Sequence, residues 1–151
     1  MAGVTAGTEV TVTLRLPANA AHVRTARLIA AAMARRCGIS EGLLDEVRLA
    51  VGEACARAVR QHERNRCLDP ITVEFAESKR FRVAVVDRAR PGAGIRAGSG
   101  ARVGGAEVPP WTDPSGDALG LALLSAVVQD LKVAPEDGGA GTRVSMSWPV
   151  G

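Results

Sequence analysis

The spacing of apolar residues is the feature that most constrains the fold of this chain. Over residues 9–16 apolar and polar side chains alternate, which is typical of a strand with one buried face, and Pro17 ends the run. Apolar residues then recur at spacings of three and four over 22–36 and again over 43–58, which predicts two amphipathic helices. Gly38 lies between them, where a glycine commonly ends a helix.

The second half of the chain contains two predicted hairpins and a long segment without periodicity. Short β-rich runs at 71–75 and 81–86 predict the first hairpin, with its turn between them. Over 88–117 the periodicity disappears and glycine and proline accumulate, so we expect either a flexible lid or a disordered linker. A helical pattern returns over 119–128, and a final hairpin is predicted over 131–148.

This order of elements predicts one α+β domain over residues 1–151. Strands with segregated helices favour a two-layer α/β sandwich, with a mostly antiparallel sheet and its helices on one face. A chain of 151 residues can bury a hydrophobic core without disulfides or metals.

Composition excludes several classes of protein. The net charge is +3, but the basic residues are scattered and aromatic residues make up only 3% of the chain, so a nucleic-acid-binding surface with stacking rings is not expected. No apolar tract is long enough to span a membrane, and the three cysteines lack metal-ligand spacing, so we expect a cytoplasmic protein. His22 and His62 belong to no catalytic pattern and are expected to be exposed on their helices.

The second predicted helix contains a carboxylate and an arginine four residues apart. Glu53 and Arg57 therefore lie on one helical face, within the segment L-L-D-E-V-R-L-A-V-G-E-A-C-A-R-A-V-R of residues 43–60. A carboxylate and a metal ligand at this spacing could both reach one phosphate. A surface salt bridge is the alternative interpretation of the same pair.

Three further local motifs follow in the chain. Asp87 comes directly after the 81–86 strand and is followed by Gly92; an ionised carboxylate there can accept a hydrogen bond from an amino group, or it can cap a turn. Gly120 and Leu121 open the 119–128 helix, whose N-terminus favours phosphate. The last motif is the pair Gly141 and Thr142, which begins the final strand.

Taken in order, these motifs resemble the GHKL (Bergerat) ATPase family, in particular its branch of anti-sigma factors that are serine-protein kinases. The resemblance covers residues 10–148. It implies that Glu53 is the catalytic base that activates the attacking hydroxyl, and that the family's magnesium-binding asparagine is replaced by Arg57. It also implies an ATP-binding set made up of Asp87, Gly92, Gly120, Leu121, Gly141 and Thr142.

The chain departs from the family at positions that contact metal or phosphate. Arg57 carries only hydrogen-bond donors and cannot coordinate a cation, so no magnesium ligand is expected there. Ala89 and Ala118 stand where the family has glycines that allow close approach to the nucleotide. We therefore expect ATP binding to be weak or absent, magnesium binding to be unsupported, and kinase activity to be small or lost.

The resemblance implies a transcription regulator that acts by partner switching. We expect it to bind a sigma factor, a STAS-type anti-sigma antagonist or both as a homodimer, with no membrane or direct nucleic-acid contact. Arg24 and Arg27, a turn apart on the first helix, match the family's partner-binding region; solvated surface arginines are the alternative. The competing functions are an active ATP-dependent serine-protein kinase and an unrelated small basic nucleic-acid binder.

Overall fold

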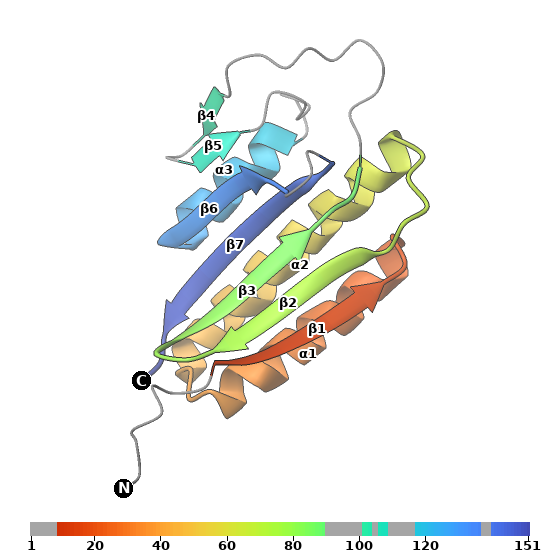
Figure 1. Ribbon diagram of the computed structural model, residues 1–151. Helices are drawn as coiled ribbons and strands as arrows, with labels where there is room; N and C mark the ends of the chain where they lie inside the picture. The colour runs from red at the N-terminus through yellow and green to blue at the C-terminus, as the bar shows by residue number, and fades with distance from the viewer. Residues whose placement is uncertain (1–8, 90–100, 104–105, 109–116, 137–139) are drawn as a thin grey trace, which may run out of the picture.

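The computed structural model describes residues 9–89, 101–103, 106–108, 117–136 and 140–151, and its framework is an antiparallel sheet covered by helices on one face (Figure 1). The predicted fold class is confirmed. The sheet has five strands in the order β1-β2-β3-β7-β6. Its elements are β1 (Val10–Leu16), β2 (Ile71–Glu77), β3 (Arg80–Val86), β6 (Asp130–Pro135) and β7 (Thr142–Pro149). The helices are α1 (Val23–Arg36), α2 (Glu41–Arg64) and α3 (Asp117–Val127), and a 3₁₀ turn, η1 (Ala20–His22), precedes α1.

The helix boundaries follow local chemistry. The Asn19 side chain accepts a hydrogen bond from the Ala21 amide at 2.9 Å and so caps η1. Gly38 has a φ of +88° just after α1 ends, a conformation that glycine adopts without steric cost. The chain therefore turns sharply there, and α2 runs back alongside α1 behind the sheet (Figure 1).

The hydrophobic core lies between the sheet and the helices. Alternate residues of the central strands point into it, and three of them are aromatic: Phe75, Phe81 and Trp148. The Phe75 and Phe81 ring centroids are 6.4 Å apart, and those of Phe81 and Trp148 are 6.1 Å apart. Since these residues come from β2, β3 and β7, aromatic contacts add to burial in holding the middle of the sheet to the helices.

The first strand is less buried than its alternation predicts. Leu14 and Leu16 pack against the core, but Val10 and Val12 remain 47% and 41% exposed. The reason is position, because β1 is an edge strand and the covering layer of helices reaches only its second half.

The segment over 88–117 contains two strands that the sequence analysis does not predict. β4 (Ala101–Val103) and β5 (Ala106–Val108) form a small antiparallel hairpin beside β6 and α3 (Figure 1). Each strand has three residues, too few to show a period of two. Most of the expected lid, including Gly92, lies outside the described residues.

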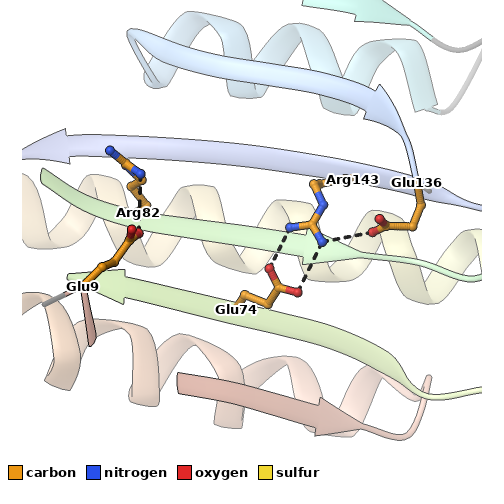
Figure 2. Close-up of polar contacts among 5 residues, drawn as sticks. All are labelled: Glu9, Glu74, Arg82, Glu136 and Arg143. Carbon is orange, nitrogen blue, oxygen red and sulfur yellow. Dashed lines mark hydrogen bonds and ion pairs between the residues drawn. The ribbon is translucent and has the colours of Figure 1, made fainter. Parts of the chain in front are cut away.

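An ion-pair cluster links strands across the open face of the sheet (Figure 2). Arg143 of β7 donates two hydrogen bonds to the Glu74 carboxylate of β2, at 2.7 and 3.2 Å, and also pairs with Glu136 at 3.2 Å. These bonds hold the pKa of Glu74 below its ordinary value. The cluster therefore stabilises the charged form of Glu74 and ties β2 to β7 across the intervening β3.

We predict that the Glu74 contacts stabilise the fold at neutral pH and lose their effect in acid. Because the folded-state pKa of Glu74 is lowered, this stabilisation is complete above the unfolded-state pKa and disappears as the pH falls through the folded-state pKa. Thermal unfolding of wild type and Glu74→Gln should therefore differ at about pH 7 and converge towards about pH 3. Glu41→Gln, which removes an exposed ion pair with Arg35, is the control and should change little. A difference for Glu74→Gln that stays constant with pH would contradict the prediction.

Candidate functional site

Two of the predicted site residues form a buried ion pair with each other. Arg57 lies on the inner face of α2, and Asp87 directly follows β3; their side chains are 2% exposed. The Arg57 Nη1 donates to the Asp87 Oδ2 at 3.0 Å, and the Ala89 amide donates to the Asp87 Oδ1 at 3.2 Å. Both carboxylate oxygens of Asp87 are therefore already hydrogen-bonded inside the protein.

The charge of Asp87 depends on this pairing. Burial raises the pKa of Asp87, because a carboxylate loses its hydration inside the protein, and the Arg57 guanidinium opposes that shift. Removing the Arg57 cation would leave the buried Asp87 carboxylate without a counter-charge. Such a loss of one partner destabilises the folded state strongly.

Gly141 and Thr142, at the start of β7, lie beside Asp87. Gly141 has a φ of +92°, and a Cβ there would lie 1.9 Å from the Asp87 carbonyl oxygen, so only glycine fits. The next residue, Thr142, is buried, and its carbonyl oxygen accepts a hydrogen bond from the Asp87 amide at 3.0 Å. The structure therefore brings Asp87, Gly141 and Thr142 together at one end of the sheet.

Glu53, the expected base, lies about one turn before Arg57 on α2 and faces α3. Its Oε1 accepts a hydrogen bond from the Arg60 Nη2 at 3.1 Å. A Cβ on Gly120 would lie 2.8 Å from the same oxygen, so the glycine at this position makes room for the Glu53 carboxylate. Leu121, by contrast, is fully buried in the hydrophobic core.

His62 is a site residue that the sequence analysis missed. It is 1% exposed, so the expectation of an exposed helical histidine is wrong. Its Nε2 accepts a hydrogen bond from the Arg88 amide at 2.8 Å, which leaves Nδ1 as the donor to the Asp69 carbonyl oxygen at 2.9 Å. Burial lowers the pKa of His62. The sequence does contain an indication of this burial. His62 follows Ala58 by four positions and so continues the row of buried residues on the inner side of α2.

The magnesium ion of the resembled family does not fit the residues present at position 57 and around it. Within the described ranges, no group of three or more His, Cys, Asp or Glu side chains could hold a metal ion. The position of the expected ligand is taken by Arg57, which offers donors only and is already paired with Asp87. Asp87, the carboxylate that the resemblance assigns to adenine, is the partner in this buried ion pair.

The two arginines of α1 border a groove that Arg48 of α2 also lines. Arg24 and Arg27 are exposed, and a groove of about 400 Å³ beside them is lined by Ala20, Arg24, Arg27, Leu28 and Arg48. The Arg27 stem lies across α2, because a Cβ on Gly52 would be 2.8 Å from the Arg27 Cδ. The predicted pair therefore does share one surface.

The antiparallel sheet with helices on one face is the architecture of a histidine kinase-like ATPase domain. The family model for the histidine kinase-like ATPase domain matches residues 16–148. The chain therefore belongs to the histidine kinase-like ATPase domain family.

A solved structure is similar over nearly the whole chain. It is that of the RsbU and RsbW domains of Rv1364c from Mycobacterium tuberculosis, with a TM-score of 0.63 and 18% sequence identity. The alignment covers 93% of this chain and 32% of that chain, so the present chain spans about a third of its length. At this identity the likeness establishes the fold alone. None of the curated proteins compared with the chain matches it.

No helix among the described residues is long and apolar enough to cross a membrane.

We predict that Arg57 and Asp87 are energetically coupled. Arg57→Met should cost about 3–5 kcal/mol in the free energy of unfolding, because it leaves Asp87 buried without its cation. The variant should recover part of this loss in acid, since the raised folded-state pKa of Asp87 favours folding below the unfolded-state pKa. Adding Asp87→Asn should restore part of the stability at neutral pH. Additive single-variant effects in urea unfolding would contradict the coupling.

Proposed function

We propose that this protein is an anti-sigma-factor-like regulator of a partner-switching system, in which ATP binding and kinase activity are weakened or lost. It acts by binding a sigma factor, an anti-sigma antagonist of the STAS type, or both. We place it in the cytoplasm as a homodimer. Membership of the histidine kinase-like ATPase family and the fold shared with a chain containing an RsbW domain support this assignment.

The buried Arg57–Asp87 ion pair is the observation that carries the loss of nucleotide chemistry. The resemblance implies that Asp87 reads the adenine amino group, but Asp87 is buried and its oxygens already accept hydrogen bonds from Arg57 and Ala89, so an amino group would have to compete with the ion pair. The same arginine places a fixed positive charge where the family has a magnesium ligand. One substitution thus opposes both adenine recognition and cation binding.

Glu53, the expected catalytic base, also forms an ion pair within the chain. Glu53 is paired with Arg60, which donates to the same carboxylate oxygen that would have to accept the hydroxyl proton. Glu53 is nevertheless partly exposed beside Gly120 at the start of α3, so an active kinase is the alternative that experiment must test.

The partner surface that we propose lies on α1. Arg24 and Arg27 are exposed there, and within the described residues neither makes an ion pair of 4.0 Å or less with an acidic side chain. A planar guanidinium binds carboxylates through two parallel hydrogen bonds, and interface arginines often contribute strongly to affinity. The surface is therefore suited to an acidic segment of a protein partner.

We predict that wild-type protein shows no magnesium-dependent ATP binding in calorimetry. Arg57→Asn should raise ATP affinity in the presence of Mg²⁺, because it frees Asp87 and supplies an oxygen ligand. Circular dichroism should confirm that the variant is folded before its titration is interpreted. Magnesium-dependent, micromolar ATP binding by wild type would contradict the prediction.

The same proteins test the kinase alternative. Wild type should transfer no radiolabel from ATP to any STAS-type protein of the organism. If transfer occurs and Glu53→Gln removes it without unfolding the protein, the alternative is correct, because that change deletes only the base.

We predict that Arg24→Glu weakens partner binding by about 2 kcal/mol or more, because reversal of an interface charge replaces attraction by repulsion. Binding should be measured pairwise against each purified sigma factor and STAS-type protein of the organism. Arg64→Glu, at the exposed end of α2, is the control and should bind as wild type does. Equal affinities for both variants would rule out the α1 surface. Salt-sensitive binding to nucleic acid alone would favour the nucleic-acid alternative.

A further inference from the structure

A groove at one end of the sheet takes no part in the function proposed above. Two of its residues, Arg15 and Thr72, lie directly opposite each other in β1 and β2. The residues on either side of them in the chain pack against the core, so both side chains point to the open face of the sheet, away from the helices (Figure 1). The groove has a volume of about 290 Å³ and is lined by Arg15, Asp69, Pro70, Thr72 and Arg88.

Two arginines give this groove its charge. Arg15 and Arg88 are exposed, and within the described ranges neither forms an ion pair of 4.0 Å or less with an acidic side chain. Hydrogen bonds from Arg143, and to a smaller extent the charge of Arg88, hold the pKa of Glu74 below its ordinary value. Both oxygens of Glu74 bond to Arg143 (Figure 2), so Glu74 does not take up the Arg88 guanidinium.

The other polar side chains of the groove are one hydroxyl and one acid. Thr72 is half-buried and supplies a hydroxyl that can donate a hydrogen bond. Asp69 is exposed and carries the single negative charge of the lining. Because the two arginines outnumber it, the groove attracts anions.

The two sides of the groove are joined by the buried histidine, His62. Its Nδ1 donates to the Asp69 carbonyl oxygen at 2.9 Å, and its Nε2 accepts from the Arg88 amide at 2.8 Å. The Arg88 carbonyl oxygen in turn accepts a weak hydrogen bond from the Cys67 thiol, with 3.6 Å between the two atoms. The backbone that carries Arg88 is therefore fixed on both sides, so that only its side chain has to be ordered when a ligand binds.

We propose that this groove binds a phosphate group through Arg15, Thr72 and Arg88. These residues come from β1, β2 and the end of β3, three neighbouring strands of the sheet. A guanidinium donates two parallel hydrogen bonds to phosphate oxygens, and a phosphate monoester offers three such oxygens with a charge close to about −2. Donors that converge from three strands suit this tetrahedral group better than a planar carboxylate, which has two oxygens and one charge.

The groove beside α1 is less suited to a phosphate group, although it contains three arginines. Arg48 already pairs there with Asp45 at 2.8 Å, and Leu28 is 62% exposed. An exposed apolar side chain among the cations fits a protein segment, as proposed above, better than a small anion. The two grooves therefore differ in the ligand that their side chains favour.

Amide chemical shifts in NMR spectra test the phosphate site. Titration with inorganic phosphate at constant ionic strength should shift the Thr72 and Arg88 signals of the wild type until they saturate. Arg15→Gln and Arg88→Gln should each weaken the affinity about tenfold, because each removes charge-assisted hydrogen bonds. Arg35→Gln, which removes an exposed arginine of α1, is the matched control and should bind as wild type does.

Two results of this titration would overturn the inference. One is a Thr72 shift that does not saturate, or that keeps its affinity when Arg15→Gln and Arg88→Gln are combined. The other is a set of shifts confined to Glu53 and Gly120, which would place the phosphate beside the candidate catalytic base instead.

Removal of the acid in the groove gives a test in the opposite direction. Asp69→Asn should strengthen phosphate binding about threefold, because an exposed like charge near the ligand is lost. The variant keeps the backbone carbonyl group that His62 bonds. An affinity that is unchanged or weaker would contradict an anion site in this groove.

A short phosphoserine peptide distinguishes the source of the phosphate. Tighter binding of this peptide than of inorganic phosphate, with the same sensitivity to Arg15→Gln and Arg88→Gln, would identify a phosphate carried by a protein. Equal affinities would identify a small free phosphate. Equal binding of the unphosphorylated peptide would overturn the inference. Because the groove lies on the sheet face opposite α1, its failure would leave the proposed partner surface standing, and Arg24→Glu tests that surface independently.

Discussion

The buried ion pair between Arg57 and Asp87 is the contact on which the arrangement of the candidate site depends. It joins the middle of α2 to the end of β3, residues that are 30 positions apart in the chain. Because the pair is almost fully excluded from solvent, it is stable only while the guanidinium and the carboxylate remain hydrogen-bonded to each other. The backbone around it is fixed accordingly, by the close approach of Gly141 and by His62, which bonds the amide of the residue after Asp87.

One departure from the family pattern contacts this carboxylate directly. Arg57 places its guanidinium against one oxygen of Asp87, while the backbone amide of residue 89 bonds the other oxygen. The side chain at position 57 therefore links α2 to the end of β3 through a buried ion pair.

The sequence was sufficient for the architecture but only partly for the site. Apolar residues recur every second position in the strands and about every 3.6 positions in the helices, because each element buries one side. The changes between these two spacings located the main strands and helices. That Arg57 cannot bind a cation also followed from its side-chain chemistry. Its partner did not, because the contact depends on how α2 packs against β3. Similarly, the role of His62 depends on backbone groups of Asp69 and Arg88, and backbone partners leave no sequence pattern.

The glycines within α2 and α3 show where this fold has limited freedom to become more stable. Glycine inside a helix is less favourable than alanine by about 0.5–1 kcal/mol, so replacement by alanine is a common stabilising change. In this protein a methyl group at Gly52 would displace the Arg27 side chain, and one at Gly120 would displace the Glu53 carboxylate. At Gly42, near the start of α2, a methyl group would meet open space, so alanine is accommodated there without moving a neighbour. Gly52 and Gly120 are therefore the helix glycines at which a gain in stability would be coupled to movement of a candidate functional side chain.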